Sequence, residues 1–313
     1  MKKITILIPA YNEFLSLSKL YDRLCLLMDN QKRYEWEILF VNDGSKDKTI
    51  DVIKKLRSID NRICYVDLSR NFGKEIALLA GFDYVTGDCT IIMDADLQDP
   101  PEIIPEMLKY WEEGYEDVYA KRKTRGKESF LRKNLSLLYY HILQKTTRVE
   151  VLENVGDFRL LDKCCINALR KLRENQRYTK GMYCWVGFKK KEILFDRGDR
   201  VNGKSSFNFL SLLSLAIEGI TSFTIAPLRL STIMGLIVST SAFIYMIAII
   251  IKTLIWGDEV QGFPTLIVII LFLGGVQLLS LGIIGEYIGR IFNETKNRPP
   301  YFASEYNGKK LHK

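Results

Sequence analysis

Two long stretches without a charged residue set the main constraint on how this 313-residue chain can fold. They occupy positions 232–251 and 263–285, and each could cross about 30 Å of hydrocarbon as a helix. A buried core helix is the alternative, but such helices seldom stay uncharged for so long. We therefore predict a transmembrane helical hairpin over 231–286, with spans at 231–256 and 263–285, after an amino-terminal domain over 1–205.

The residues that flank these stretches predict their orientation. The connecting segment 257–262 carries two acids and no base, whereas basic residues precede the first stretch and follow the second. Because basic flanks tend to stay in the cytoplasm, both termini should lie there. Residues 206–230 have apolar residues at helical spacing interrupted by serines and Glu218, which is typical of an amphipathic helix at the membrane interface. The cytoplasmic tail over 287–313 is polar from Tyr301 and should be poorly ordered.

The net charge of +8 suggests an anionic partner. Much of the excess lies within 121–133 and beside the apolar stretches, where lipid headgroups and phosphorylated substrates explain it at least as well as nucleic acid. We expect a membrane and no nucleic acid as partners. The six cysteines show no Cys-x-x-Cys spacing and no nearby histidine cluster, so we expect reduced thiols and no zinc site.

The amino-terminal domain alternates between two kinds of apolar pattern. Short apolar runs predict strands at 4–9, 37–42, 63–68 and 90–93, and helical spacing predicts helices at 13–29, 47–58 and 74–85. This alternation predicts an α/β fold with a Rossmann-like, mostly parallel sheet, which binds ligands at the carboxyl ends of its strands. A polar segment follows each predicted strand, at 9–13, 42–45, 69–74 and 94–96, and together these segments predict a pocket. No Gly-x-Gly-x-x-Gly follows the first strand, so a dinucleotide-binding dehydrogenase is poorly supported.

Two carboxylates end the fourth predicted strand. Asp94 and Asp96 are alternate residues, which point the same way in a strand, so they could converge on one cation. Carboxylate oxygens suit Mg²⁺ or Mn²⁺, and such sites borrow further oxygens from substrate phosphates. A solvated acidic turn before Pro100 is the alternative, and the Asp-x-Asp pattern by itself does not decide between the two.

Five motifs, taken in order, carry a resemblance to a known family. They lie at 8–13, 41–45, 94–102, 156–159 and 200–205. They resemble the inverting family-2 glycosyltransferases with a GT-A fold, and more narrowly the membrane-anchored polyprenyl-phosphate glycosyltransferases. This group includes bactoprenol glucosyltransferases and dolichyl-phosphate mannose synthases. The resemblance covers essentially the whole chain and is nearest to the bacterial glucosyl-type enzymes with two spanning helices.

The resemblance implies a site for a nucleotide sugar. The base and ribose would be bound by the residues that follow the first two strands, and the diphosphate and its metal by those that follow the fourth. The nucleotide-sugar residues would be Pro9, Tyr11, Glu13, Asp43, Asp94, Asp96 and Gln98, with Asp94 and Asp96 as metal ligands. An N-cap or turn role is the alternative for Glu13 and Asp43, and ordinary core packing is the alternative for Tyr11.

The resemblance also implies a phosphate-binding acceptor side. Arg122, Arg200, Lys204 and Ser205 would bind the acceptor phosphate, and Asp157 corresponds to the family's proposed base. A phosphomonoester has a second pKa of about 6, so such an acceptor is largely ionised at neutral pH without help. Asp157 could therefore act as a base or orient the basic residues, and the sequence leaves both roles open.

The implied enzyme is a hexosyltransferase of the bacterial inner membrane, multi-pass, with its catalytic domain in the cytoplasm. It would transfer one sugar, glucose or a related hexose, from a UDP-sugar to undecaprenyl phosphate with inversion. The lipid-linked product would serve the modification of a cell-envelope glycan, for example lipopolysaccharide. This use would require a downstream flippase and an acceptor glycosyltransferase. The enzyme could also form a homo-oligomer. The alternatives are a mannose synthase that uses GDP-mannose, a processive polysaccharide synthase, whose Gln-x-x-Arg-Trp motif is absent, and a non-catalytic membrane scaffold.

Overall fold

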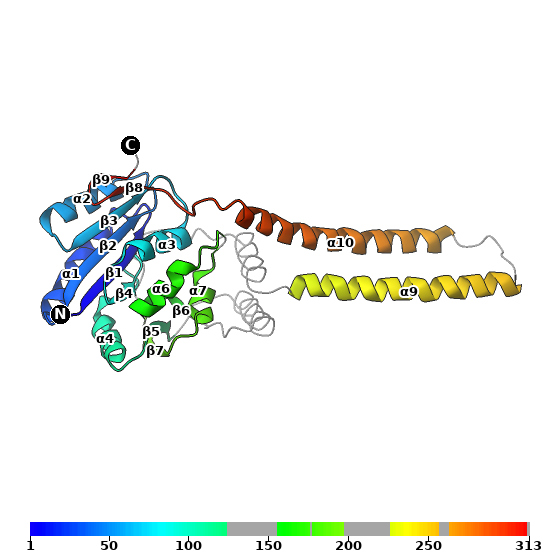
Figure 1. Cartoon of the computed structure of the whole chain (residues 1–313), viewed down its shortest axis with the longest axis horizontal. Helices are drawn as coiled ribbons and strands as arrows, with labels where there is room; N and C mark the ends of the chain where they lie inside the picture. The colour runs from blue at the N-terminus through cyan, green and yellow to red at the C-terminus, as the bar shows by residue number, and fades with distance from the viewer. Residues whose placement is uncertain (124–154, 176, 197–225, 257–262, 312–313) are drawn as a thin grey trace. The chain divides into compact units, whose positions relative to one another are not determined.

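The computed structural model describes residues 1–123, 155–175, 177–196, 226–256 and 263–311 (Figure 1). The chain forms two compact units: residues 1–212 together with 299–313, and residues 213–298. The predicted interfacial helix before Ala226 and the connecting segment 257–262 lie outside the described residues. The amino-terminal unit contains the predicted ligand site.

The described strands form a single sheet with the order β7-β5-β6-β4-β1-β2-β3-β8-β9. The strands are β1 (Lys3–Ala10), β2 (Glu35–Asn42), β3 (Ile63–Leu68), β4 (Cys89–Ile92), β5 (Asp117–Arg122), β6 (Val155–Asp162), β7 (Lys190–Phe195), β8 (Ala303–Tyr306) and β9 (Lys309–Lys310). The helices of this unit are α1 (Leu17–Asn30), α2 (Thr49–Ile59), α3 (Lys74–Tyr84), the 3-10 helix η1 (Pro101–Ile103), α4 (Ile104–Glu112), α6 (Lys163–Lys171) and α7 (Thr179–Trp185).

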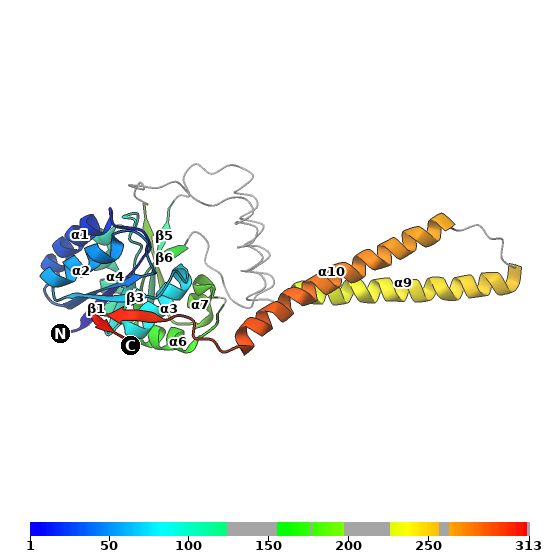
Figure 2. The same cartoon turned by 90° about the horizontal axis from the view of Figure 1, so that it is seen from above.

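The first four strands confirm the predicted parallel α/β core. β1 pairs in parallel with β2 and β4, and β2 pairs in parallel with β3. Helices α1, α2 and α4 cover one face of the sheet, and α3 and α6 cover the other (Figure 2). Since both faces are covered, nearly every residue of β1 and β2 is buried, which explains their continuous apolar runs. On the α3 side, a Cβ added at Gly81 would lie 2.3 Å from Leu7 Cδ1, so a larger residue there would force the Leu7 side chain to shift.

Strand β6 changes the character of the sheet, because it runs antiparallel to both β4 and β5. The sheet as a whole is therefore mixed. The reversal has a direct effect on the site, since it brings the amino end of β6 to the edge where β4 has its carboxyl end. Ile92 lies opposite Arg159, and continuing this register by two residues puts Asp157 opposite Asp94.

The carboxyl-terminal tail corrects one prediction. Residues from Tyr301 were expected to be poorly ordered, but β8 pairs antiparallel with β3 and forms a hairpin with β9 (Figure 1). The turn is Asn307-Gly308, with φ of 48° and 86°, and this dipeptide is a strong short-range hairpin signal. Asn307 Oδ1 also accepts a hydrogen bond of 2.8 Å from the Tyr65 N–H. β8 covers the backbone of β3, which would otherwise be an exposed edge.

The second unit contains two long apolar helices, α9 (Ala226–Trp256) and α10 (Phe263–Thr295). Both are long and apolar enough to cross a membrane, and large side chains such as Leu236, Leu278 and Leu281 are exposed on them. Each helix extends beyond the predicted span. α10 continues past 285 because no proline occurs between that position and Pro299, and Glu286 and Arg290 form an i,i+4 pair with a separation of 3.1 Å.

Removal of residues 303–313 should lower the thermal midpoint of the amino-terminal unit by several degrees. The truncation exposes the edge of β3 and removes the Asn307 and Glu305 partners of Tyr65. The measurement is thermal unfolding of the detergent-solubilised protein followed by near-UV circular dichroism. Removal of 312–313 alone, which leaves β8 and β9 intact, is the control. Equal midpoints for the two truncated proteins would contradict a stabilising role for β8.

Candidate active site

Two turns at the carboxyl edge of the sheet are tied together by hydrogen bonds. Asn12, with φ of 57°, accepts a bond of 2.9 Å from the Lys46 N–H through Oδ1. Its own N–H donates to Ser45 Oγ over 3.0 Å, and the N–H of Glu13 donates to Thr49 Oγ1 over 2.9 Å. The turns after β1 and β2 therefore form one rim.

Asp43 ties the turn after β2 to the segment that precedes α3. Asp43 is only 3% exposed, and its carboxylate accepts bonds from the Phe72 N–H (2.7 Å) and the Gly73 N–H (2.9 Å). Burial raises the pKa of Asp43, and the two N–H donors act against that rise. Gly44, with φ of 60°, lies so close to this segment that an added Cβ would be 2.2 Å from the Arg70 carbonyl carbon. Asp43 thus performs the turn role that the sequence left open.

The other predicted nucleotide residues lie at the same edge. Pro9 is buried in β1, whereas Tyr11 just beyond it is 41% exposed. Glu13 accepts a bond of 2.9 Å from Ser16 Oγ. Gln98 is buried, and its Oε1 has no hydrogen-bond partner within the described ranges.

The acidic segment after β4 folds back on itself. The Asp94 N–H donates to Asp99 Oδ2 over 3.0 Å, and the Gln98 N–H donates to Asp96 Oδ1 over 3.1 Å. Leu97 between them has φ of 66°. Burial and the nearby charge of Asp94 raise the pKa of Asp99 to about 7. The segment therefore concentrates negative charge that a cation would stabilise.

Lys74 joins the two predicted catalytic regions, although it was not among the predicted site residues. Its Nζ lies 2.6 Å from Asp94 Oδ1 and 2.7 Å from Asp157 Oδ2. The signal in the sequence was its position, because it ends the polar segment after the third strand and begins α3. The charge partners of a lysine, however, depend on which strands lie beside it in the sheet.

Asp157 is a buried carboxylate that nearby positive charges keep ionised. Its side chain is 8% exposed. Burial by itself would raise the pKa of Asp157, but the positive charges of Lys74 and Lys180 outweigh this effect and lower it to about 2. A carboxylate with so low a pKa is a weak general base and a strong partner for cations.

The basic residues around Asp157 have different surroundings. Arg159 is buried, pairs with Asp117 at 3.1 Å and stacks over the ring of Tyr183, with 3.7 Å from Cζ to the ring centroid. Arg122 lies beside the start of β6, since a Cβ added at Gly156 would be 3.5 Å from Arg122 Nη2. The other predicted acceptor residues, Arg200, Lys204 and Ser205, lie outside the described residues.

The donor atoms available at Asp94 and Asp96 fit a hard divalent cation. In the part of the chain that the structure describes, no three His, Cys, Asp or Glu side chains are grouped to hold a metal. Mg²⁺ and Mn²⁺ need no complete protein cage, because they commonly combine one or two carboxylates with substrate phosphates and water. The two carboxylates therefore suit a cation that binds together with a diphosphate.

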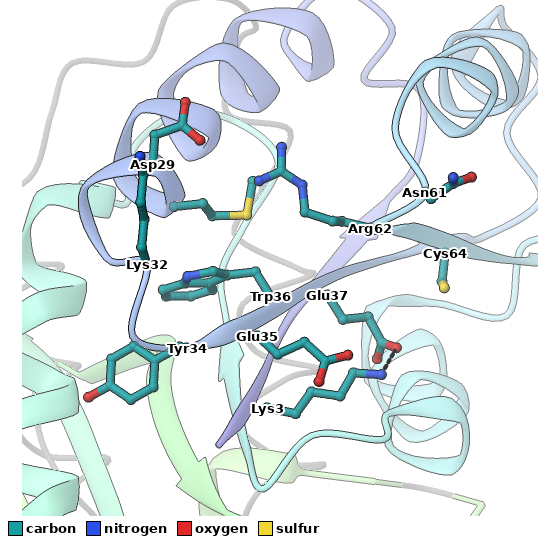
Figure 3. Close-up of a pocket in the computed structure, with 11 residues that line it drawn as sticks. Lys3, Asp29, Lys32, Tyr34, Glu35, Trp36, Glu37, Asn61, Arg62 and Cys64 are labelled. Atoms are coloured by element: carbon teal, nitrogen blue, oxygen red, sulfur yellow. Dashed lines mark hydrogen bonds and ion pairs between the residues drawn. The ribbon is translucent and has the colours of Figure 1, made fainter. Parts of the chain in front are cut away.

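A hollow of about 480 Å³ lies elsewhere (Figure 3). Its lining includes Lys3, Glu35 and Glu37 at the amino ends of β1 and β2, and Lys3 and Glu37 form an ion pair of 2.7 Å there. Because β1 and β4 are parallel, this hollow is at the opposite edge of the sheet from Asp94. It is separate from the candidate active site.

Comparison with known proteins gives concordant matches. Residues 5–168 match glycosyl transferase family 2, and residues 226–291 match the GtrB C-terminal hairpin. An uncharacterized glycosyltransferase of Synechocystis sp. is 44% identical over 306 residues, covering 98% of this chain and 96% of that protein. The prophage bactoprenol glucosyl transferase homolog of Escherichia coli (strain K12) is 42% identical over 299 residues, covering 96% of this chain and 97% of that protein.

A solved structure is more distant. Glucosyl-3-phosphoglycerate synthase from Mycobacterium tuberculosis, in complex with Mn²⁺, UDP-glucose and phosphoglyceric acid, aligns with a TM-score of 0.47 and 18% identity. The alignment covers 69% of this chain and 76% of that chain. The family match and the nearly full-length relatives agree with a sheet that gathers its acidic residues at the carboxyl edge, and the chain therefore belongs to glycosyl transferase family 2 and is a glycosyltransferase.

Proposed function

We propose that this enzyme transfers one glucose from UDP-glucose to undecaprenyl phosphate, with inversion at the anomeric carbon. The observation that carries the proposal is the position of Lys74, which links a donor-side carboxylate, Asp94, to an acceptor-side carboxylate, Asp157. Relatives named bactoprenol glucosyl transferase support the sugar and the lipid. The two apolar helices support an acceptor that resides in a membrane.

On the donor side, the rim after β1 and β2 would bind the nucleotide. The exposed ring of Tyr11, next to Pro9, can stack on the base, and the Glu13 carboxylate can accept hydrogen bonds from the ribose. Asp43 would act mainly by fixing the rim, since both of its oxygens already accept backbone N–H groups. The amide of Gln98 would lie near the diphosphate.

Asp94 and Asp96 would hold Mg²⁺ or Mn²⁺ at the diphosphate. When bound there, the cation stabilises the charge that develops on the departing diphosphate. The acceptor phosphate would be bound by Arg122 together with Arg200, Lys204 and Ser205.

Asp157 would position basic side chains around the acceptor phosphate and would not remove a proton from it. Its pKa of about 2 makes it a poor proton acceptor, and the acceptor phosphate, with a second pKa of about 6, is already largely a dianion at neutral pH. An oxygen of this phosphate would attack the anomeric carbon opposite the leaving nucleotide. The lipid-linked glucose would then need a flippase and a second transferase to reach a cell-envelope glycan.

Asp96→Asn should reduce transfer by about two to three orders of magnitude, because it removes a ligand of the cation that stabilises the leaving group. EDTA should abolish transfer reversibly in the wild-type enzyme. The assay incubates membranes with undecaprenyl phosphate and radiolabelled UDP-glucose, with GDP-mannose as the competing donor. Asp88→Asn, at a half-buried carboxylate near the amino ends of the strands, is the control. Full activity in EDTA would refute the metal assignment, and preferential use of GDP-mannose would refute the donor.

Asp157→Asn should reduce activity by a factor that is constant above about pH 7. The physical reason is that wild-type Asp157 stays ionised far below this range and the phosphate has already lost its second proton. The measurement is kcat for both enzymes from pH 6 to pH 9. A variant whose rate climbs steeply with pH while the wild-type rate stays flat would show instead that Asp157 removes a proton.

The membrane orientation that we propose places both termini and the active site in the cytoplasm, with residues 257–262 outside. A cysteine introduced at Asp258 should react with a membrane-impermeant maleimide added to intact cells, and one introduced at Gly308 should react only after lysis. The wild-type chain, with its six native cysteines, gives the background. Labelling of Gly308→Cys in intact cells would show that the orientation is the opposite of the one proposed and that the acceptor lies in the other leaflet.

A further inference from the structure

The ammonium group of Lys74 occupies a position that a divalent cation would also need. Nζ lies 2.6 Å from Asp94 Oδ1, so a cation bound to Asp94 would lie close to a second positive charge. Like charges this close repel strongly where the surroundings exclude part of the solvent, and Asp94 is 35% exposed. Lys74 therefore opposes the binding of a cation to Asp94 when no anion lies between them.

Two buried carboxylates restrain Lys74, one beside its backbone and one at its charged end. Lys74 is the first residue of α3 and follows Gly73, which has φ of 95° and whose N–H is bound by the buried Asp43. Asp157, 2.7 Å from Nζ and 8% exposed, holds the ammonium from the other side. Both the start of the side chain and its charged end are thus fixed by buried carboxylates.

A diphosphate removes this conflict. An ammonium group has three donors, of which two account for the bonds to Asp94 and Asp157, so the third can serve a phosphate oxygen. A diphosphate bound at Asp94 and Asp96 would place negative charge between the cation and Lys74 and would attract both. The repulsion that opposes the cation alone then becomes attraction in the ternary complex.

We infer that Lys74 makes divalent-cation binding conditional on the diphosphate of the donor. This inference rests on the proposed function, because it assigns Lys74 to the same donor site. Its consequence is that the enzyme binds the cation and the nucleotide as a unit and binds the cation poorly alone. A merely structural ion pair would have a different signature, because its loss would weaken both kinds of binding or neither.

The test measures Mn²⁺ binding to the full-length protein in detergent by electron paramagnetic resonance, with Mn²⁺ alone and with UDP or inorganic pyrophosphate. Lys74→Met should bind Mn²⁺ alone about tenfold more tightly than wild type does. In the presence of UDP or pyrophosphate, the same variant should bind Mn²⁺ at least about tenfold more weakly than wild type does. About tenfold is a usual size for the coupling between two binding sites. Lys74→Arg, which keeps the charge, should retain the wild-type pattern. Lys163→Met is the matched control, since Lys163 also begins a helix and faces a carboxylate, Asp88, at 3.8 Å.

Lys74→Met leaves the buried Asp157 without its main cation, which could prevent folding. The double variant Lys74→Gln with Asp157→Asn avoids this problem, because it replaces the ion pair with neutral amides, and it is compared with Asp157→Asn alone. Tighter binding of Mn²⁺ alone together with weaker binding in the presence of UDP or pyrophosphate supports the inference. Unchanged or weaker binding of Mn²⁺ alone overturns it. If wild type shows the conditional pattern with pyrophosphate but transfers no glucose to undecaprenyl phosphate, the proposed function fails and the role of Lys74 stands.

Discussion

One ammonium group between two carboxylates is the interaction on which the candidate active site depends. Lys74 connects the start of α3 to the end of β4 through Asp94 and to the start of β6 through Asp157. Without it, two negative charges would face each other at this edge, one of them buried, and an unpaired buried charge is costly. The same contact keeps Asp157 ionised, so the electrostatics and the geometry of the site have a common origin.

The rest of the amino-terminal unit places this contact with little freedom. The parallel strands β1, β2, β3 and β4 bring the ends of four strands to one edge, and hydrogen bonds from Asn12 and Asp43 join the turns there into a rim. The chain leaves this unit for the apolar helices and returns to it as β8, so the unit is connected to the hairpin at both ends.

Much of the fold could be predicted because the signals are local. The buried strands of a parallel sheet read as continuous apolar runs, and the helices between them carry apolar residues at helical spacing, such as Leu17, Leu20 and Leu24. The placement of Asp94 beyond the end of β4 followed from the same reasoning. The ordered tail was not predicted although its signal was local too, because Asn307-Gly308 lies in a short polar segment whose partner strand, β3, is more than two hundred residues away in the chain.

The sequence by itself determined the four parallel strands and the three helices between them, the two apolar helices, and the residue types that gather at the carboxyl edge, because each of these depends on periodicity or on near neighbours in the chain. Only the tertiary structure decided that β6 enters the sheet antiparallel and brings Asp157 to Asp94, and that Lys74 pairs with both. The burial that makes Asp43 a support for the rim and the charges that lower the pKa of Asp157 were decided in the same way. The physical reason is that burial and ion pairing depend on which strands become neighbours in space, and the pattern of any one segment does not contain that information.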